Sequence, residues 1–359
     1  MTRYGALGYR GGFAVRHRLK DVAERAGVSV KTVSNVVNGY VHVRPDTRAR
    51  VEQAIAELNY RPNLSARHLR KGRTGVIALA VPELDIPYFA ELARHVVTAA
   101  ADYGWTVLID QTGGRREQER VVASGITDHL IDGLIFSPLA LTAEDLTGLD
   151  GAPMVLLGER VDHGPADRVV IDNVAAAREI TSHLIQLGHR RIAAIGSQRT
   201  DEGASARLRL AGYADAHRAA GLDFDETLVA PAAAWHRADG AAAMRGLLTS
   251  GVRPDAVFCF NDTLALGALR ALHEAGLRVP DDVAVVGFDD IEDGRFSIPT
   301  LTTVAPDKER IARLAVELLA NRLDGDRAAP ARELSAPYRV ELRESTQKVS
   351  ALAAGVPPQ

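Results

Sequence analysis

The chain has 359 residues, 46% of them hydrophobic, and a net charge of −3, which fits a soluble protein of two or three domains rather than one compact core. No stretch approaches the run of about 18 apolar residues that a membrane helix needs, and the N-terminus lacks the apolar segment of a secretory signal. A single cysteine, Cys259, excludes an internal disulfide, so we expect a protein of the reducing cytoplasm.

The charge is distributed unevenly along the chain. Residues 1–73 hold 15 lysines and arginines against 5 acidic residues, whereas the remainder holds 28 against 41. A head of net charge +10 on a body of −13 is typical of a module that binds a polyanion. A solvated basic tail has the same composition, so the residue pattern has to decide between the two.

Two short helices are predicted in this basic head. Helical periodicity begins at Leu19 in LKDVAERAG, and Gly27 ends it. Ser29 is a good N-cap for a second helix, which follows at once. The apolar stripe of the second helix consists of Val33, Val36 and Val37. Two helices joined by a glycine-containing turn indicate a helix-turn-helix.

The second helix leaves a slim, weakly charged face free for DNA. That face consists of Val30, Lys31, Ser34 and Asn35. Slim side chains let a helix approach base edges in the major groove, where asparagine pairs with adenine, lysine with guanine and a valine methyl with thymine. The arginines flank this helix and would hold phosphates. A third helix, beginning at Pro45 in RPDTRARVEQAIAELNY, completes a small all-α domain.

The head resembles the DNA-binding domain of the lactose repressor (LacI/GalR) family. The resemblance covers LKDVAERAGVSVKTVSNVVNG and VRPDTRARVEQAIAELNYRPN. It implies that Val30, Lys31 and Asn35 read bases, although many family members have arginine in place of Asn35, which changes the expected half-site. The full set expected to contact DNA is Ser29, Val30, Lys31, Thr32, Ser34, Asn35, His42, Arg67 and Leu69.

A polar linker, RPNLSARHLRKGR, follows the head. Composition alone is compatible with a flexible tether. The family resemblance implies instead a short hinge helix that inserts Leu69 into the minor groove at the operator centre, with Arg67 on nearby phosphates. The segment is too short to be a stable helix alone, so we expect it to order on DNA.

From residue 74 the sequence alternates buried strands with amphipathic helices. The predicted strands are nearly continuous apolar runs, as parallel strands covered on both faces should be. They lie in TGVIALAVP, GWTVLID, DGLIFSP, PMVLLGE, RIAAIGS, AVFCFND and VAVVGFDD. We predict an α/β core of two doubly wound lobes.

Polar residues follow these strands, at the edge where such sheets bind ligands. They are Asp85, Gln111, Ser137, Glu159, Arg160, Ser197, Asn261, Asp262, Asp289 and Asp290. Carboxylate, amide and guanidinium groups match a polyhydroxylated ligand, whose hydroxyls both donate and accept hydrogen bonds. Tyr88, Phe89 and Trp235 are candidates for stacking on its ring.

The core resembles the effector-binding core of the same family, itself similar to periplasmic sugar-binding proteins. The recurring phrases are QLGHRRIAAIGS, SARLRLAGY, FNDTLALGALRALHEAGLRVPDDVAVVGFDD and PTLTTV. The resemblance implies that Arg209 grips the effector with Arg207 nearby. The expected effector-binding residues are Asp85, Tyr88, Phe89, Arg207, Arg209, Trp235, Asn261 and Asp289.

These observations predict five segments. They are a disordered arm (1–16), the helix-turn-helix domain (17–62), the hinge (63–73), the core (74–345) and a disordered tail (346–359). We expect the first lobe to comprise about 74–171 and 304–335, and the second about 173–302 and 336–345. The chain should therefore cross between the lobes three times, which makes a hinge for closure.

We considered an enzyme and an exported solute-binding protein as alternatives. No nucleophile elbow, P-loop or dinucleotide-binding glycine motif is present, and the 11 histidines form no metal motif, so we expect no catalytic residue, metal or cofactor. An exported binding protein would need a signal peptide and no basic head. We instead expect a homodimeric repressor on a pseudo-palindromic operator, away from the membrane and nucleoid-associated when bound. Its effector is expected to be a carbohydrate, with purines as the alternative, and either an inducer or a co-repressor.

Overall fold

The computed structural model describes residues 17–37, 40, 42–58, 60, 73–125, 130–149, 151–198, 203–325 and 329–347. The chain divides into two compact units, a head in residues 1–72 and a core in residues 73–359. The arm expected at 1–16, residues 63–72 of the expected hinge (63–73) and residues 348–359 of the expected tail (346–359) lie outside the described residues.

The head consists of three helices, α1 (Leu19–Ala26), α2 (Val30–Val37) and α3 (Pro45–Glu57). Gly27 ends α1 in the left-handed conformation, with φ of 63°, and the Ser29 hydroxyl accepts a hydrogen bond from the Thr32 amide at 3.1 Å. Val22, Val33 and Val51, one from each helix, are fully buried against one another. The predicted helix-turn-helix is confirmed.

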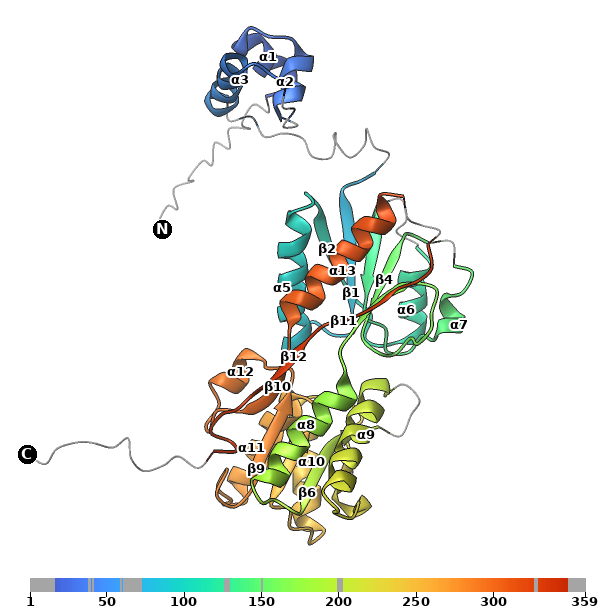
Figure 1. Ribbon diagram of the computed structural model, residues 1–359, viewed down its shortest axis with the longest axis vertical. Helices are drawn as coiled ribbons and strands as arrows, with labels where there is room; N and C mark the ends of the chain where they lie inside the picture. The colour runs from blue at the N-terminus through green and yellow to red at the C-terminus, as the bar shows by residue number, and fades with distance from the viewer. Residues whose placement is uncertain are drawn as a thin grey trace, which may run out of the picture. The chain divides into compact units, whose positions relative to one another are not determined.

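The first lobe of the core is built on a six-stranded parallel sheet with strand order β11-β5-β4-β3-β1-β2. Its strands are β1 (Val76–Val81), β2 (Thr106–Gln111), β3 (Gly133–Phe136), β4 (Met154–Leu157), β5 (Asp167–Val170) and β11 (Glu333–Ser335). Helices α5 (Pro87–Ala101) and α13 (Lys308–Leu323) lie side by side on one face, and α6 (Arg116–Ala123) and α7 (Ala143–Leu146) cover the other (Figure 1).

Strand β1 shows why its sequence reads as one apolar run. Ile77, Leu79 and Val81 pack under α5 and α13, whereas Ala78 and Ala80 pack towards α6. Successive side chains of a strand point to opposite faces, so a strand covered on both faces needs apolar residues at every position. The predicted doubly wound architecture is confirmed.

The second lobe repeats this plan, with strand order β12-β10-β9-β8-β6-β7. Its strands are β6 (Ile192–Ser197), β7 (Val229–Pro231), β8 (Ala256–Cys259), β9 (Ala284–Phe288), β10 (Thr302–Pro306) and β12 (Tyr338–Glu341), the last antiparallel to β10. Its helices are α8 (Asn173–Gln186), α9 (Ala204–Ala219), α10 (Arg237–Thr249), α11 (Asp262–Glu274) and the short α12 (Glu292–Arg295), with a 3-10 turn at Glu226–Leu228.

The boundaries between the lobes differ slightly from those expected. We expected the return to the first lobe at residue 304, but β10 runs to Pro306 and pairs with β9 and β12, so it belongs to the second sheet throughout. The chain therefore returns between Pro306 and Lys308. The second lobe also extends beyond residue 345, because Thr346 is buried and its hydroxyl lies 2.8 Å from that of Thr302.

Within the described residues, no helix combines the length and the apolar character needed to cross a membrane. Cys259 is buried at the end of β8, and burial raises the pKa of its thiol.

Helices α10 and α11 contact each other closely because glycines face each other across them. A methyl group at Gly267 of α11 would overlap the carbonyl oxygen of Arg237, and one at Gly240 of α10 would overlap that of Leu264. Gly246 lies on the exposed side of α10, with no atom within 4 Å of the position of a Cβ.

This difference predicts opposite effects of the same substitution. Gly267→Ala should destabilise the core by ~1–3 kcal/mol through overpacking, whereas Gly246→Ala should stabilise it by ~0.5–1 kcal/mol because alanine loses less backbone entropy in a helix. Urea unfolding followed by circular dichroism measures both. Equal effects of the two substitutions would contradict the close packing of α10 on α11.

Candidate functional sites

The outward face of α2 is the candidate DNA-reading surface. Val33 and Val36 hold the helix on α1 and α3, which leaves the opposite side accessible. On that side the side chain of Val30 is 45% exposed. Ser29 and Lys31 are also exposed, and Thr32, Ser34 and Asn35 are half-buried. His42 is exposed and its ring packs edge-on to that of Tyr40, with centroids 5.4 Å apart.

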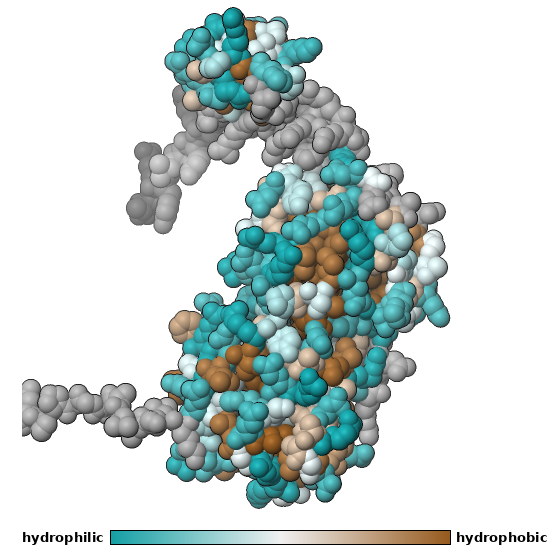
Figure 2. All heavy atoms as spheres, in the orientation of Figure 1, coloured by the Kyte–Doolittle hydropathy of each residue, from teal (hydrophilic) through white to brown (hydrophobic). Residues whose placement is uncertain are grey.

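The head also carries exposed cations. Arg18, Arg44 and Arg50 are exposed, and the visible surface of the head is mostly hydrophilic (Figure 2). Arg25 and Arg48 have protein partners, Glu57 at 2.5 Å and the Tyr40 carbonyl at 2.7 Å. Arg67 and Leu69, expected to contact DNA, lie outside the described residues. Arg73 belongs to the core, where it pairs with Asp324 at 2.9 Å.

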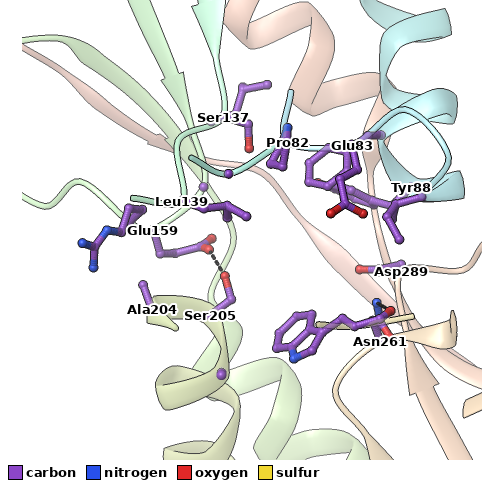
Figure 3. A pocket seen from close by; sticks show the side chains of 18 of the residues that line it. Pro82, Glu83, Tyr88, Ser137, Leu139, Glu159, Ala204, Ser205, Asn261 and Asp289 are labelled. Carbon is purple, nitrogen blue, oxygen red and sulfur yellow. Dashed lines mark hydrogen bonds between the residues drawn. The ribbon is translucent and has the colours of Figure 1, made fainter. Parts of the chain in front are cut away.

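A cavity of about 380 Å³ lies between the two lobes, at the carboxyl ends of the strands (Figure 3). The first lobe contributes Tyr88 and Phe89 from the start of α5, and the second contributes Trp235. The charged and polar residues that line it are Glu83, Ser137, Glu159, Arg160, Gln198, Ser205, Arg209, His236, Asn261 and Asp289. The cavity lies at the edge where the polar residues that follow the strands predict a ligand site.

Arg209 of α9 is the buried cation of the cavity, only 6% exposed. Its Nε donates to Asn173 Oδ1 at 2.8 Å and its Nη1 donates to the carbonyl of Phe260. The guanidinium carbon lies 3.5 Å from the centre of the Phe288 ring and 5.3 Å from that of Trp235. Burial lowers the pKa of Arg209, and the carboxylates of Asp289 and Glu159 oppose that effect. The guanidinium is thus fixed in direction before any ligand arrives.

Asp289 follows β9 and presents its carboxyl group to the cavity (Figure 3). Its φ of 116° is rare for a residue with a side chain and costs ~1–3 kcal/mol, a strain found mainly at functional sites. Burial raises the pKa of Asp289 to about 6, although Arg209 and Lys308 act in the opposite direction. Among the described residues, no group donates a hydrogen bond to its carboxyl oxygens. The carboxylate therefore has full accepting capacity for a ligand.

Asn261 and Trp235 line the cavity, but their polar side-chain atoms form hydrogen bonds within the protein. Asn261 caps α11, because its Oδ1 accepts from the Leu264 amide at 2.8 Å, and its Nδ2 donates to the Trp235 carbonyl at 3.0 Å. Trp235 Nε1 donates to the Gly196 carbonyl at 3.0 Å. What Trp235 offers a ligand is therefore its ring. Asp262, next to Asn261, accepts from Thr303 and from the Ile291 amide beneath the cavity and does not line it.

Two residues expected at the site do not line the cavity. Asp85 is exposed, and Glu83, two residues earlier in the same loop, faces the cavity instead. Arg207 is exposed because residues two apart on a helix lie about 200° apart around its axis, so Arg207 and Arg209 cannot face the same way. Helical periodicity in ARLRLAG could have separated these two arginines.

The expected set omitted Glu83, Ser205 and His236, and these residues join the two lobes. Glu83 of the first lobe lies 2.6 Å from Nε2 of His236 in the second. Ser205 of the second lobe donates to Glu159 of the first at 3.0 Å (Figure 3). Contacts between distant parts of the chain leave no local signal in the sequence, and only the position of Glu83 just after a strand hints at its role.

A helix-turn-helix joined to a two-lobed core with a cavity between the lobes defines a class of protein, the DNA-binding regulator that responds to a small molecule. The comparisons agree with this class. Residues 18–63 match the family model for bacterial regulatory proteins of the lacI family, and residues 181–346 match that for a periplasmic binding protein-like domain. The HTH-type transcriptional repressor CytR of Escherichia coli strain K12 is 34% identical over 86% of this chain and 90% of its own length.

Two solved structures extend the match to the whole architecture. The complex of the transcriptional regulator CelR with cellobiose is 34% identical, covers 92% of this chain and 100% of its own, and gives a TM-score of 0.68. The lac repressor dimer bound to operator and an anti-inducer is 31% identical, covers 92% of this chain and 99% of its own, and gives a TM-score of 0.71. The chain belongs to the lacI family of bacterial regulatory proteins. It is an effector-responsive, DNA-binding transcriptional repressor and not an enzyme.

The contact between Glu83 and His236 predicts a pH-dependent bridge between the lobes. The hydrogen bond to Glu83 is the main cause of a raised pKa of His236, followed by opposing burial and by the charges of Glu83, Asp239 and Asp85. Because the pKa is raised, the bridge is fully present below the ordinary histidine pKa of about 6.5 and is lost as pH rises through the raised value.

Glu83→Gln should therefore lower the pKa of His236, measured by NMR of the full-length protein labelled with ¹³C-histidine and assigned with His236→Gln. Asp239→Asn serves as the matched control and should lower it less, because Asp239 acts on the pKa of the ring through its charge, and asparagine can keep the hydrogen bond that the Asp239 side chain accepts from the His236 backbone amide at 3.2 Å. An unchanged pKa in Glu83→Gln would show that the bridge is absent in solution.

Proposed function

We propose that this repressor acts as a homodimer on a pseudo-palindromic operator, that α2 reads each half-site, and that a carbohydrate bound between the lobes switches its affinity for DNA. The observation that carries the effector assignment is the Asp289 carboxylate, held at a strained φ of 116° with no protein donor among the described residues and facing a cavity lined with aromatic rings.

The exposed face of α2 supports the assignment of base readers. Val30 offers methyl groups to thymine, Lys31 donates to guanine, and the Asn35 amide pairs with adenine. Ser29, Thr32, Ser34 and His42 lie on or beside this helix and supply hydroxyl and imidazole groups to the same groove or its phosphates. The hinge residues Arg67 and Leu69 complete the proposal, with the leucine inserted at the operator centre.

The chemistry of the cavity supports a carbohydrate. Asp289 and Glu159 accept hydrogen bonds from hydroxyl donors, and Arg209 donates to hydroxyl oxygens from a fixed direction. The rings of Tyr88 and Trp235 cover the apolar face of a sugar. The similarity to CelR, whose structure contains cellobiose, favours the same class of ligand.

A ligand of this kind touches both lobes at once. Glu159 and Tyr88 belong to the first lobe, and Arg209 and Asp289 to the second. The ligand therefore stabilises the arrangement in which the two lobes are closed on it. Closure changes the position of the two first lobes relative to each other in the dimer, and each first lobe is joined to a hinge. The coupling is reciprocal, so operator DNA changes the affinity for the effector by the same factor. An effector that favours the DNA-bound arrangement is a co-repressor, and one that opposes it is an inducer. The lac repressor dimer on its operator supports the dimeric arrangement.

Substitutions in α2 should change which DNA is selected. Lys31→Ala and Asn35→Ala should each relax the preference at one position of the half-site, at a cost of ~1–3 kcal/mol, when DNA is selected from random duplexes. Arg44→Ala is the control. Loss of a phosphate contact should weaken binding to all DNA sequences about equally. It should also reduce the slope of log K against log salt concentration by about 1. An unchanged selected sequence in both α2 variants would assign base reading to other residues.

Removal of the buried cation should strongly weaken the effector response. We expect a saccharide, tested as cellobiose and ribose, to raise the melting temperature of the wild-type protein. Arg209→Met should weaken that binding by about 10-fold or more, since a charged hydrogen bond contributes ~1.5–3 kcal/mol, and operator affinity without saccharide should persist. Arg207→Ala, on the exposed side of the same helix, is the matched control and should respond normally. Stabilisation by adenine or guanine, with no response to either saccharide, would replace the carbohydrate with a purine.

A further inference from the structure

A buried lysine holds the backbone of Asp289 from behind the cavity. Lys308 is the first residue of α13, directly after the chain returns to the first lobe. Its Nζ donates to the carbonyl oxygens of Asp289 at 2.7 Å and Asp290 at 3.0 Å, and lies 2.6 Å from the carboxylate of Glu91. The ammonium group has three donors, and these three acceptors use all of them.

The two carbonyls belong to the strained segment of the site. Asp289 and Asp290 both have positive φ, 116° and 50°. Such backbone conformations persist only where the surroundings fix them. The Asp290 side chain is held by Arg295 and Arg343, each at 2.5 Å, whereas the Asp289 side chain faces the cavity. Lys308 therefore fixes the backbone that aims the Asp289 carboxylate.

Glu91 extends this contact to the wall of the cavity. It lies on α5 one turn after Tyr88, whose ring lines the cavity. Its second carboxylate oxygen accepts a hydrogen bond from the Glu292 amide, at the start of α12 in the second lobe, at 3.0 Å. One ion pair thus joins α5, α13 and the loop that carries Asp289.

We propose that Lys308 is the positioning residue for Asp289, and that the Glu91–Lys308 ion pair links occupation of the cavity to helix α5. The proposal rests on the role of Asp289 as an effector ligand. Lys308 and Glu91 carry no direct contact with the effector. They act by setting the direction and the charge of the carboxylate that does.

The charges around Asp289 make this role separable from simple structural support. The groups that act on it are Arg209, Lys308, Glu91, Glu159, Tyr88 and Asp262. Lys308 lowers the pKa of Asp289 and Glu91 raises it. Both substitutions break the same ion pair, but Lys308→Met should raise the pKa of Asp289 and Glu91→Gln should lower it.

The test measures this pKa in the full-length protein by NMR of ¹³C-labelled aspartate carboxyl groups, assigned with Asp289→Asn. We expect midpoints about one pH unit above the wild-type value in Lys308→Met and below it in Glu91→Gln. Arg313→Met, which breaks the exposed pair of Arg313 with Glu309 on the same helix, is the control and should leave the midpoint unchanged. Thermal unfolding identifies any variant that fails to fold, in which case the other variant still tests its own direction.

Cellobiose binding provides the second measurement, at pH 8, where Asp289 is ionised in the wild type. Asp289 stays largely ionised at pH 8 in both variants, so a loss of affinity there reports the direction of the carboxylate. Lys308→Met should weaken binding by about 10-fold or more through loss of the charged hydrogen bond to the effector, and Glu91→Gln, which keeps the lysine on both carbonyls, by less than about 3-fold. Shifts of the midpoint in the same direction in both variants, or none in either folded variant, would overturn the positioning role. If wild-type protein binds no saccharide but the midpoints move in opposite directions, the carbohydrate assignment fails and the positioning of Asp289 by Lys308 stands.

Discussion

A guanidinium group buried among aromatic rings needs negative charge close by, and this requirement organises the middle of the core. The guanidinium of Arg209 is desolvated and packs on the rings of Phe288 and Trp235. The negative charges of Asp289 and Glu159 offset the cost of this desolvation. The carboxylates come from opposite lobes, so the charge balance of one lobe depends on the other. A buried charge without a partner is expensive, which makes the separation of the lobes electrostatically unfavourable in an empty cavity. A ligand with hydroxyl groups enters a site that is already polarised.

The sequence predicted the architecture well because burial on both faces of a parallel sheet leaves continuous apolar runs. Seven strands were located in this way: β1, β2, β3, β4, β6, β8 and β9. The strands that it did not identify include β7 (Val229–Pro231) and β11 (Glu333–Ser335), which have three residues each and lie at the edges of the two sheets. A strand of three residues is too short to show a recognisable hydrophobic pattern, and its position in the sheet depends on pairing with the neighbouring strand. Strand β10 is longer, but two buried threonines, Thr302 and Thr303, interrupt its apolar run, and the return to the first lobe was therefore placed at residue 304, inside this strand.

The site was predicted less completely, and the reasons are physical. Residues directly after strands, such as Asp289 and Asn261, follow from topology alone. The sequence does not reveal that the Asn261 amide is already used, with its oxygen capping α11 and its nitrogen donating to the Trp235 carbonyl. Helix capping and ligand binding use the same residue types, so the residue alone cannot distinguish them. Glu83, Ser205 and His236 were missed because each gains its partner only when the two lobes meet.

The order of elements along the chain has a consequence for synthesis. The head is complete within the first sixty or so residues, whereas the first lobe needs α13 and β11 and the second needs β12, all from the last part of the sequence. Domains fold as units while the ribosome is still elongating the chain. A nascent or prematurely terminated polypeptide thus carries a complete helix-turn-helix domain before either lobe of its core, and so the effector cavity between them, is whole.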